Sequence, residues 1–263
     1  RAAIDAFDRY DVPATWAVVG HLFLEECPGD HESHPAGANV CHRPVGDLSA
    51  REAWFGDDLV AAVQDAAVDH ELAGHGFTHV PFDVDYLDPS DVLQKLEWTR
   101  QAARRRGVDC STLVFPADRP AYRQVLSTLE FDCYRSPGPA GRSDREETRA
   151  TDGGRTDDPV TPPLVDPRVD EYGLVNVPTS MYLFDPTGPI DPLVGSESDD
   201  PLTDRAVRSV EAAAAGDGVC HLSLHPHDLT DDRSVGRLRS VLSRAATLRK
   251  REGLEIRTLG GLA

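Results

Sequence analysis

The sequence predicts an α/β protein built around a parallel β-sheet, either closed into a barrel or layered with helices. Short apolar runs alternate with amphipathic segments of helical period along the whole chain of 263 residues. No sharp change of composition marks a domain boundary, so we expect one domain spanning residues 1–263. Hydrophobic residues make up 40% of the chain, which is enough to bury a sizeable core.

The N-terminal half begins with a helix. Ile4, Phe7 and Tyr10 recur at helical spacing, and Pro13 ends the pattern. Residues 14–20 form a near-continuous apolar run, as expected for a buried parallel strand. Residues 25–52 are rich in Gly, Pro, His and Asp and predict a long irregular insertion. Further helices are expected at 57–68 and at 89–106, with Ser90 as cap and Gly107 as stop, and strands just before His75 and at 113–116.

A second irregular insertion is expected at residues 136–170, where Pro, Gly, Arg and Asp abound and apolar pattern is nearly lost. Helical and strand-like segments alternate on both sides of it, so the α/β pattern continues to the end of the chain. The expected helices cover residues 121–129, 204–215 and 235–251, and the expected strands cover 131–135, 174–178, 219–225 and 254–259.

The chain is strongly acidic, with 45 acidic residues, 27 basic ones and a formal net charge of −18. Lys95 and Lys250 are its only lysines. An acidic, lysine-poor surface leads to the hypothesis of a protein adapted to high salt, from a halophile. Such a surface repels polyanions, so we expect neither nucleic acid nor an anionic membrane as partner.

The five cysteines are odd in number and form no Cys-x-x-Cys motif, which favours reduced thiols. Cys27 and Cys41 flank a stretch rich in glycine and histidine and are open to pairing, metal binding or a plain loop. No apolar run reaches the length of a membrane span, and no signal peptide is visible. We therefore expect a cytoplasmic protein, and the sequence leaves its oligomeric state open.

The most informative motif is the pair His75 and His79, four residues apart after a short apolar run. On a strand that spacing spans roughly 13 Å, too far for one shared metal ion. On one helical turn it places the two side chains about 5–6 Å apart. Gly74 and Gly76 permit the necessary bend, and Pro81 stops the turn from growing into a helix. The alternative is two polar loop residues.

Residues able to do chemistry follow three expected strands. They are the histidine pair, Asp118 with Arg119, and a third group formed by His225, His227 and Asp228. Active residues of parallel α/β folds gather at the C-terminal ends of strands, so we expect these groups to share one rim. His221 and Trp16 also lie on strands and are as well explained by packing.

Several of these segments resemble polysaccharide deacetylases, the NodB-homology carbohydrate esterases of family 4. Residues 12–20 look like the family's early strand. Residues 75–79 match both histidines of its second motif, with glycine in place of Ser/Thr. Residues 222–225 match its late strand ending in His, and residues 255–259 are similar to its last strand. The resemblance covers most of the chain outside the two insertions.

The resemblance implies a distorted (β/α)7-type barrel and a divalent metal, most often zinc, bound by one Asp and two His. His75 and His79 would then be metal ligands and His225 the general acid. The reaction would be hydrolysis of an N-acetyl group on a glycan, or of a related amide. Asp118, Arg119, His227, Asp228 and Trp16 would bind substrate or support the ligands.

The sequence departs from the family at its first motif, which supplies the metal-binding Asp and the catalytic base. That motif precedes the first helix, which begins here at residue 1, so both aspartates are missing from the sequence as given. A truncated or degenerate homologue that only binds glycan or metal is the alternative. A separate metal cluster of His221, His225 and His227 is a third possibility. A His-Glu-x-x-His peptidase is excluded, because Gly76 stands where the Glu would be.

Overall fold

The computed structural model describes residues 1–29, 39–138, 164–184, 200–216 and 218–263. Residues 30–38 of the first expected insertion and 139–163 of the second lie outside the described residues. The chain divides into two compact units. One comprises Arg1–Pro13, Pro137–Arg168 and Val177–Arg257, and will be called the helical unit; the other comprises Ala14–Ser136, Val169–Asn176 and Thr258–Ala263, and will be called the sheet unit.

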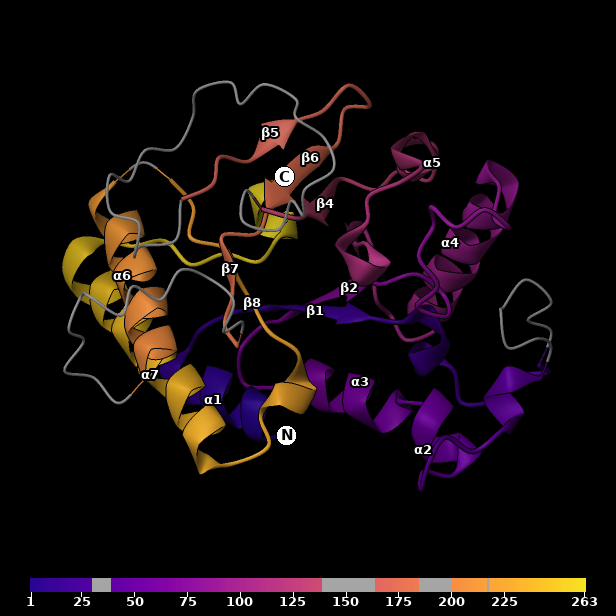
Figure 1. The fold of residues 1–263 in the computed structure, drawn as a ribbon, viewed down its shortest axis with the longest axis horizontal. Helices are drawn as coiled ribbons and strands as arrows, with labels where there is room; N and C mark the ends of the chain where they lie inside the picture. Colours follow the sequence, from indigo (N-terminus) through magenta and orange to yellow (C-terminus); the bar gives the residue numbers. More distant parts are fainter. Residues whose placement is uncertain (30–38, 139–163, 185–199, 217) are drawn as a thin grey trace. The chain divides into compact units, whose positions relative to one another are not determined.

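The sheet unit is built on parallel strands, which confirms the predicted α/β class. Strand β1 pairs with β2, β2 with β3 and β3 with β4, all in parallel. The six-stranded sheet has the order β1-β2-β3-β4-β6-β5, so β1 is an edge strand and is only half-buried rather than buried as expected (Figure 1). The strands are β1 (Thr15–Val18), β2 (Glu71–Gly74), β3 (Thr112–Val114), β4 (Cys133–Ser136), β5 (Arg168–Val169) and β6 (Val175–Pro178).

Helices follow the strands of the sheet unit, as the sequence predicts, although one helix and one 3-10 turn begin within the insertion expected at residues 25–52. They are α2 (Ala50–Trp54), α3 (Asp57–Gln64), α4 (Pro89–Arg104) and α5 (Arg123–Thr128), with short 3-10 turns η1 (Gly20–Phe23), η2 (Val40–His42), η3 (Pro116–Asp118) and η6 (Gly260–Leu262). The prediction that Ser90 is the N-cap of α4 is wrong. Asp88 caps this helix, because its carboxylate accepts the backbone N–H groups of Ser90 and Asp91.

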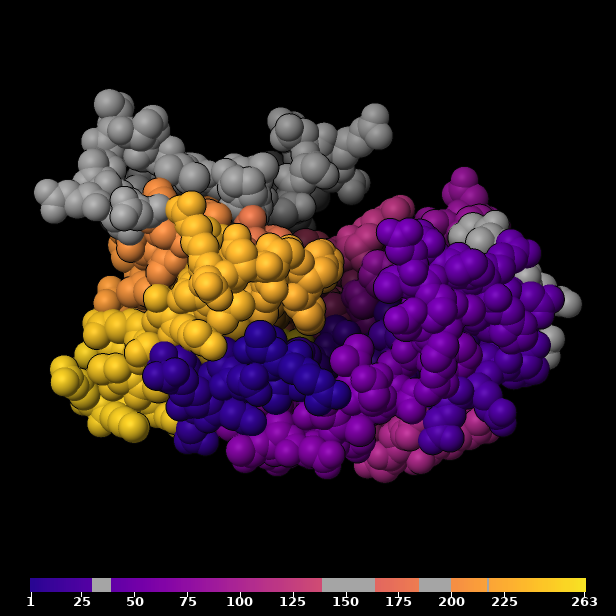
Figure 2. Space-filling model, turned by 90° about the horizontal axis from the view of Figure 1, so that it is seen from below, coloured from indigo at the N-terminus to yellow at the C-terminus, as the bar shows by residue number. Residues whose placement is uncertain are grey.

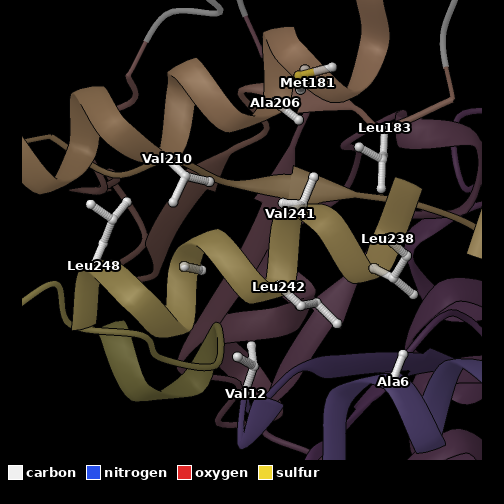
Figure 3. Close-up of a cluster of buried hydrophobic side chains, with 11 residues drawn as sticks. Ala6, Val12, Met181, Leu183, Ala206, Val210, Leu238, Val241, Leu242 and Leu248 are labelled. Atoms are coloured by element: carbon white, nitrogen blue, oxygen red, sulfur yellow. The ribbon is translucent and has the colours of Figure 1, made fainter. Parts of the chain in front are cut away.

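The helical unit packs three helices around an apolar cluster. They are α1 (Ala2–Tyr10), α6 (Pro201–Ala215) and α7 (Asp232–Glu252), beside the parallel pair β7 (Met181–Tyr182) and β8 (Leu222–Ser223). Leu238, Val241 and Leu242 of α7 point into the cluster with Val210 of α6 (Figure 3). Figure 2 shows the indigo atoms of α1 against the yellow atoms of the C-terminal region. At this junction Arg249 pairs with Asp11 at 2.9 Å.

Two expected strands differ from the structure. Residues 254–259 form no strand. The backbone N–H of Leu259 donates a hydrogen bond to the side-chain hydroxyl of Thr15 and not to a neighbouring strand. The strand expected at 219–225 shrinks to Leu222–Ser223. The implied barrel is not seen either, because the described strands form an open six-stranded sheet and a separate pair. No helix in the described part of the chain is both long and apolar enough to cross a membrane.

Candidate functional site

The first candidate site lies where β2 ends. The backbone N–H of His75 continues the pairing with β1 by donating to the carbonyl of Val18, 3.0 Å away. Its side-chain Nδ1 lies 2.8 Å from the carbonyl oxygen of Val114, at the end of β3. A carbonyl only accepts hydrogen bonds, so Nδ1 carries the proton and the lone pair of His75 is on Nε2. Histidines that bind metals are usually oriented in this way.

The chain bends sharply between the two histidines. Gly76 has φ +69° and His79 has φ +61°, so both adopt the left-handed conformation. The bend brings the imidazole rings of His75 and His79 to a centroid distance of 4.6 Å, with an angle of 64° between their planes. His75 is half-buried and His79 is exposed. The predicted pairing of the two rings is therefore present.

The charge state of His75 suits a metal ligand. Burial lowers its pKa to about 4, and His79 and Arg135 add to this, while the hydrogen bond to Val114 and the charge of Asp118 act in the opposite direction. The imidazole is consequently neutral at pH 7, as metal binding requires.

Asp118 belongs to the same site, and Arg135 holds it there. The Nε of Arg135, on β4, lies 3.1 Å from Oδ1 of Asp118, and one guanidinium NH₂ donates to the same oxygen. Ala117 and Asp118 both have positive φ, at 57° and 52°. Such backbone is uncommon in non-glycine residues and clusters at functional sites. The sequence indicated Asp118 but gave no sign of Arg135.

Two other predicted residues do not join this group. Arg119 pairs instead with Asp83, at 2.6 Å. Trp16 lies half-buried on β1 with its ring in edge contact with His70, at a centroid distance of 5.7 Å. The packing alternative describes Trp16 adequately.

The second candidate site lies in the helical unit, after β8. The hydroxyl of Tyr182, on β7, lies 2.6 Å from Nδ1 of His225 and donates to the carboxylate of Asp228. Because the single phenolic proton goes to Asp228, Nδ1 of His225 must donate to the Tyr182 oxygen. The backbone N–H of His225 also donates to Asp228, at 2.9 Å. Nε2 is thus the atom of His225 available for chemistry.

Asp228 is the anionic end of the hydrogen-bonded series His225–Tyr182–Asp228. Burial raises its pKa, but the hydrogen bonds from Tyr182 and from the His225 backbone, with the nearby imidazoles, outweigh burial and lower the pKa overall. Together, Asp228, Tyr182 and His225 form an arrangement in which the histidine can gain and release a proton.

His227 lies next to His225 and Asp228 of this hydrogen-bonded series. Its ring stacks on that of His225 at 4.9 Å, and its Nε2 lies 3.8 Å from Asp228. Ligand atoms of these three residues lie within 4.8 Å of one another, so they are a possible metal-binding group. His221 is not a member of this group. Its Nδ1 lies 2.9 Å from the carbonyl oxygen of Pro178. The hypothesised cluster of His221, His225 and His227 is therefore wrong about His221, and Asp228 is the third member instead.

A third group of potential ligands consists of His21, Cys27 and Cys41, in the sheet unit. His75 and His79 are not members of this group, and no third ligand completes their pair among the described residues. The expected convergence of the histidine pair with His225 on one rim stays a prediction.

Comparison with known proteins gives a likeness in structure. No family model and no curated protein sequence matches the chain. The chain is similar in structure to a family 4 carbohydrate esterase from Streptomyces lividans in complex with acetate, at 14% sequence identity. The alignment covers 96% of this chain and 81% of that one, with a TM-score of 0.46. A TM-score below 0.5 does not establish a shared fold, so the likeness assigns no family.

Proposed function

We propose that this protein is a metal-dependent hydrolase that removes N-acetyl groups from a glycan, or cleaves a related non-peptide amide. The observation that supports this most directly is the oriented His75, which donates Nδ1–H to the Val114 carbonyl and has His79 beside it at 4.6 Å. The resemblance of residues 75–79 and 222–225 to polysaccharide deacetylases names the reaction class. A single domain and a cytoplasmic location belong to the same proposal.

The histidine pair fits two of the three protein ligands of a catalytic zinc site. Nε2 of His75 is the ligating atom that its tautomer implies, and the ring of His79 faces it across the bend. A zinc ion bound there would supply Lewis acidity for the acyl carbonyl. Among the described residues no carboxylate lies close enough to both histidines to act as third ligand.

The chain's own residues have distinct roles in this proposal. His225 protonates the leaving amine through Nε2, because its Nδ1–H is committed to Tyr182. Asp228 stabilises the positive charge that His225 carries before it gives up the proton. Arg135 fixes Asp118 beside His75, where the carboxylate can bind a substrate hydroxyl or amide N–H.

The alternative is a homologue that binds metal or glycan without catalysis. Metal content and acetate release separate the two. We expect the purified protein to retain zinc through His75 and His79, and to release acetate from oligomers of N-acetylglucosamine. His75→Ala and His79→Ala should each lower zinc content and abolish acetate release, and His225→Ala should abolish release while zinc content stays unchanged.

His70→Gln is the matched control, since His70 precedes the same strand and accepts the backbone N–H of Ala14 at 3.2 Å, a bond that a glutamine oxygen can accept. It should leave both readouts intact. Zinc content equal to that of the wild type in both alanine variants would sink the metal proposal. Zinc lost with these variants, but no acetate release by the wild type, would favour the non-catalytic homologue.

A further inference from the structure

A second set of metal-ligating atoms converges in the sheet unit and includes neither His75 nor His79. One ring nitrogen of His21 and the sulfur atoms of Cys27 and Cys41 all lie within 4.8 Å of one another. His21 lies in η1, Cys27 in the loop after it, and Cys41 in η2. Cys41 is fully buried and His21 is 1% exposed.

His21 is oriented for ligation by its surroundings. Its Nδ1 lies 2.6 Å from the carbonyl oxygen of Trp54, so Nδ1 donates and the lone pair is on Nε2. The rings of Phe55 and Phe77 contact the imidazole at centroid distances of 5.0 and 5.8 Å. An imidazole fixed by a backbone carbonyl on one side and aromatic rings around it is held in one rotamer, as supporting residues do at metal sites.

The segment after Cys27 directs a backbone N–H group at its sulfur. The backbone N–H of Gly29 donates to the sulfur of Cys27, at 3.4 Å. Gly29 has φ +92°, and a Cβ there would lie 2.3 Å from Oδ1 of Asn39, so the turn requires glycine. An N–H group directed at sulfur stabilises negative charge on it, and thiolate is the form that binds metals.

The two cysteines are brought together by the backbone and not by a shared strand or helix. The N–H of Asn39 donates to the carbonyl of Gly29 at 2.8 Å, and Nε2 of His42 lies 2.8 Å from the carbonyl of Cys27. These two bonds close the loop between the cysteines at its base. The ligand atoms are therefore preorganised, which lowers the entropic cost of binding an ion.

We propose that His21, Cys27 and Cys41 bind a structural zinc ion, independent of the hydrolase site. Two thiolates and one imidazole are soft and borderline donors, which select zinc and exclude calcium and magnesium. The ion would join η1 to η2 and stabilise a segment with few buried apolar side chains of its own. Neither cysteine takes part in the proposed hydrolysis, so this site can be tested separately.

The test uses the full chain carrying His75→Ala and His79→Ala, so that the hydrolase site contributes no zinc. After loading with zinc chloride and gel filtration, about one zinc per chain should remain in this background. Adding Cys27→Ser and Cys41→Ser should remove it. Cys110→Ala, which alters another buried cysteine of the same unit, is the matched control and should leave it bound.

Cobalt replacement in the unmutated chain keeps the proposal falsifiable if the cysteine variants fail to fold. Thiolate ligands should give an intense sulfur-to-cobalt charge-transfer absorption, which excess zinc chloride abolishes. The absence of that band would overturn the proposal, as would zinc content unaffected by the cysteine changes. A Cys27–Cys41 disulfide, found by counting thiols in the denatured protein purified without reductant, would overturn it as well.

Discussion

The hydroxyl oxygen of Tyr182 lies 2.6 Å from Nδ1 of His225, on the strand that pairs with the one leading to this histidine. The same hydroxyl donates to Asp228, so it connects an imidazole to a carboxylate that do not pair directly at hydrogen-bond distance. The tyrosine thereby fixes which nitrogen of His225 faces outward.

Replacing Tyr182 with phenylalanine should impair the proposed proton transfer without disturbing the fold. We expect kcat for acetate release to fall about 10- to 100-fold, an effect typical of residues that orient a site histidine, with little change in KM. Tyr86→Phe, on an exposed tyrosine, is the control and should leave kcat unchanged. An unchanged kcat in Tyr182→Phe would contradict the role given to Tyr182.

The depressed pKa of His75 predicts an acid-dependent loss of stability. Its folded pKa of about 4 lies below the ordinary value of 6.5, so the unfolded chain binds the proton more readily. The stabilisation is complete above pH 6.5 and is lost as the pH falls toward 4, with an upper bound of about 3 kcal/mol. Urea unfolding with chelator present should show wild type losing more stability than His75→Asn between about pH 7 and pH 4.5. Equal losses of stability in wild type and His75→Asn would refute the role given to His75. The control is His227→Asn, which changes an exposed imidazole and should behave as wild type.

Glu71 joins separate segments of the sheet unit through its carboxylate. It accepts from the hydroxyl of Thr15 at 2.6 Å, from the hydroxyl of Thr112, and from the backbone N–H of Gly260 at 3.0 Å. Glu71→Gln places an NH₂ group against these donors, and we expect the free energy of unfolding to fall by about 1–3 kcal/mol. Glu255→Gln, which removes only an exposed ion pair with Arg257, should cost at most about 1 kcal/mol. Chemical denaturation of both variants measures the difference, and similar costs would show that the Glu71 network adds little.

The net charge of −18 predicts that salt stabilises the protein. Repulsion among the acidic side chains opposes the compact state, and dissolved ions screen it. The melting temperature should therefore rise from low salt to molar KCl, and calorimetry across that range provides the measurement. A melting temperature that stays level or falls would contradict the hypothesis of adaptation to high salt.

Long periodic segments made most of the fold predictable. The helices at α1, α4 and α7 and the strands β1 to β4 fall within a few residues of their expected positions, because hydrophobic period survives tertiary context. The strand predicted at residues 254–259 was wrong, because an alternating apolar pattern does not by itself provide a neighbouring strand to pair with. The N–H of Leu259 bonds to Thr15 and that of Gly260 to Glu71, and neither partner is visible from the local sequence.

The candidate sites were predictable where the partners are close in sequence. His75 and His79 follow from spacing and from the two glycines, and the bend at Gly76 is confirmed. Tyr182 was missed because it lies 43 residues before His225 and sits in a two-residue strand with no distinctive pattern. Arg135 was missed for a similar reason, since its partner Asp118 lies 17 residues before it and no local pattern links the two.

Gly20 occupies the start of η1, where α4 passes close behind it. A Cβ at this position would lie 2.7 Å from Oγ1 of Thr99 and 2.9 Å from its Cα, inside contact distance. The backbone N–H of Gly20 meanwhile donates to the carbonyl of Gly76, in the bend between the paired histidines. In a saturation-mutagenesis survey, position 20 would therefore score as intolerant as a catalytic residue, although it has no side chain to bind anything.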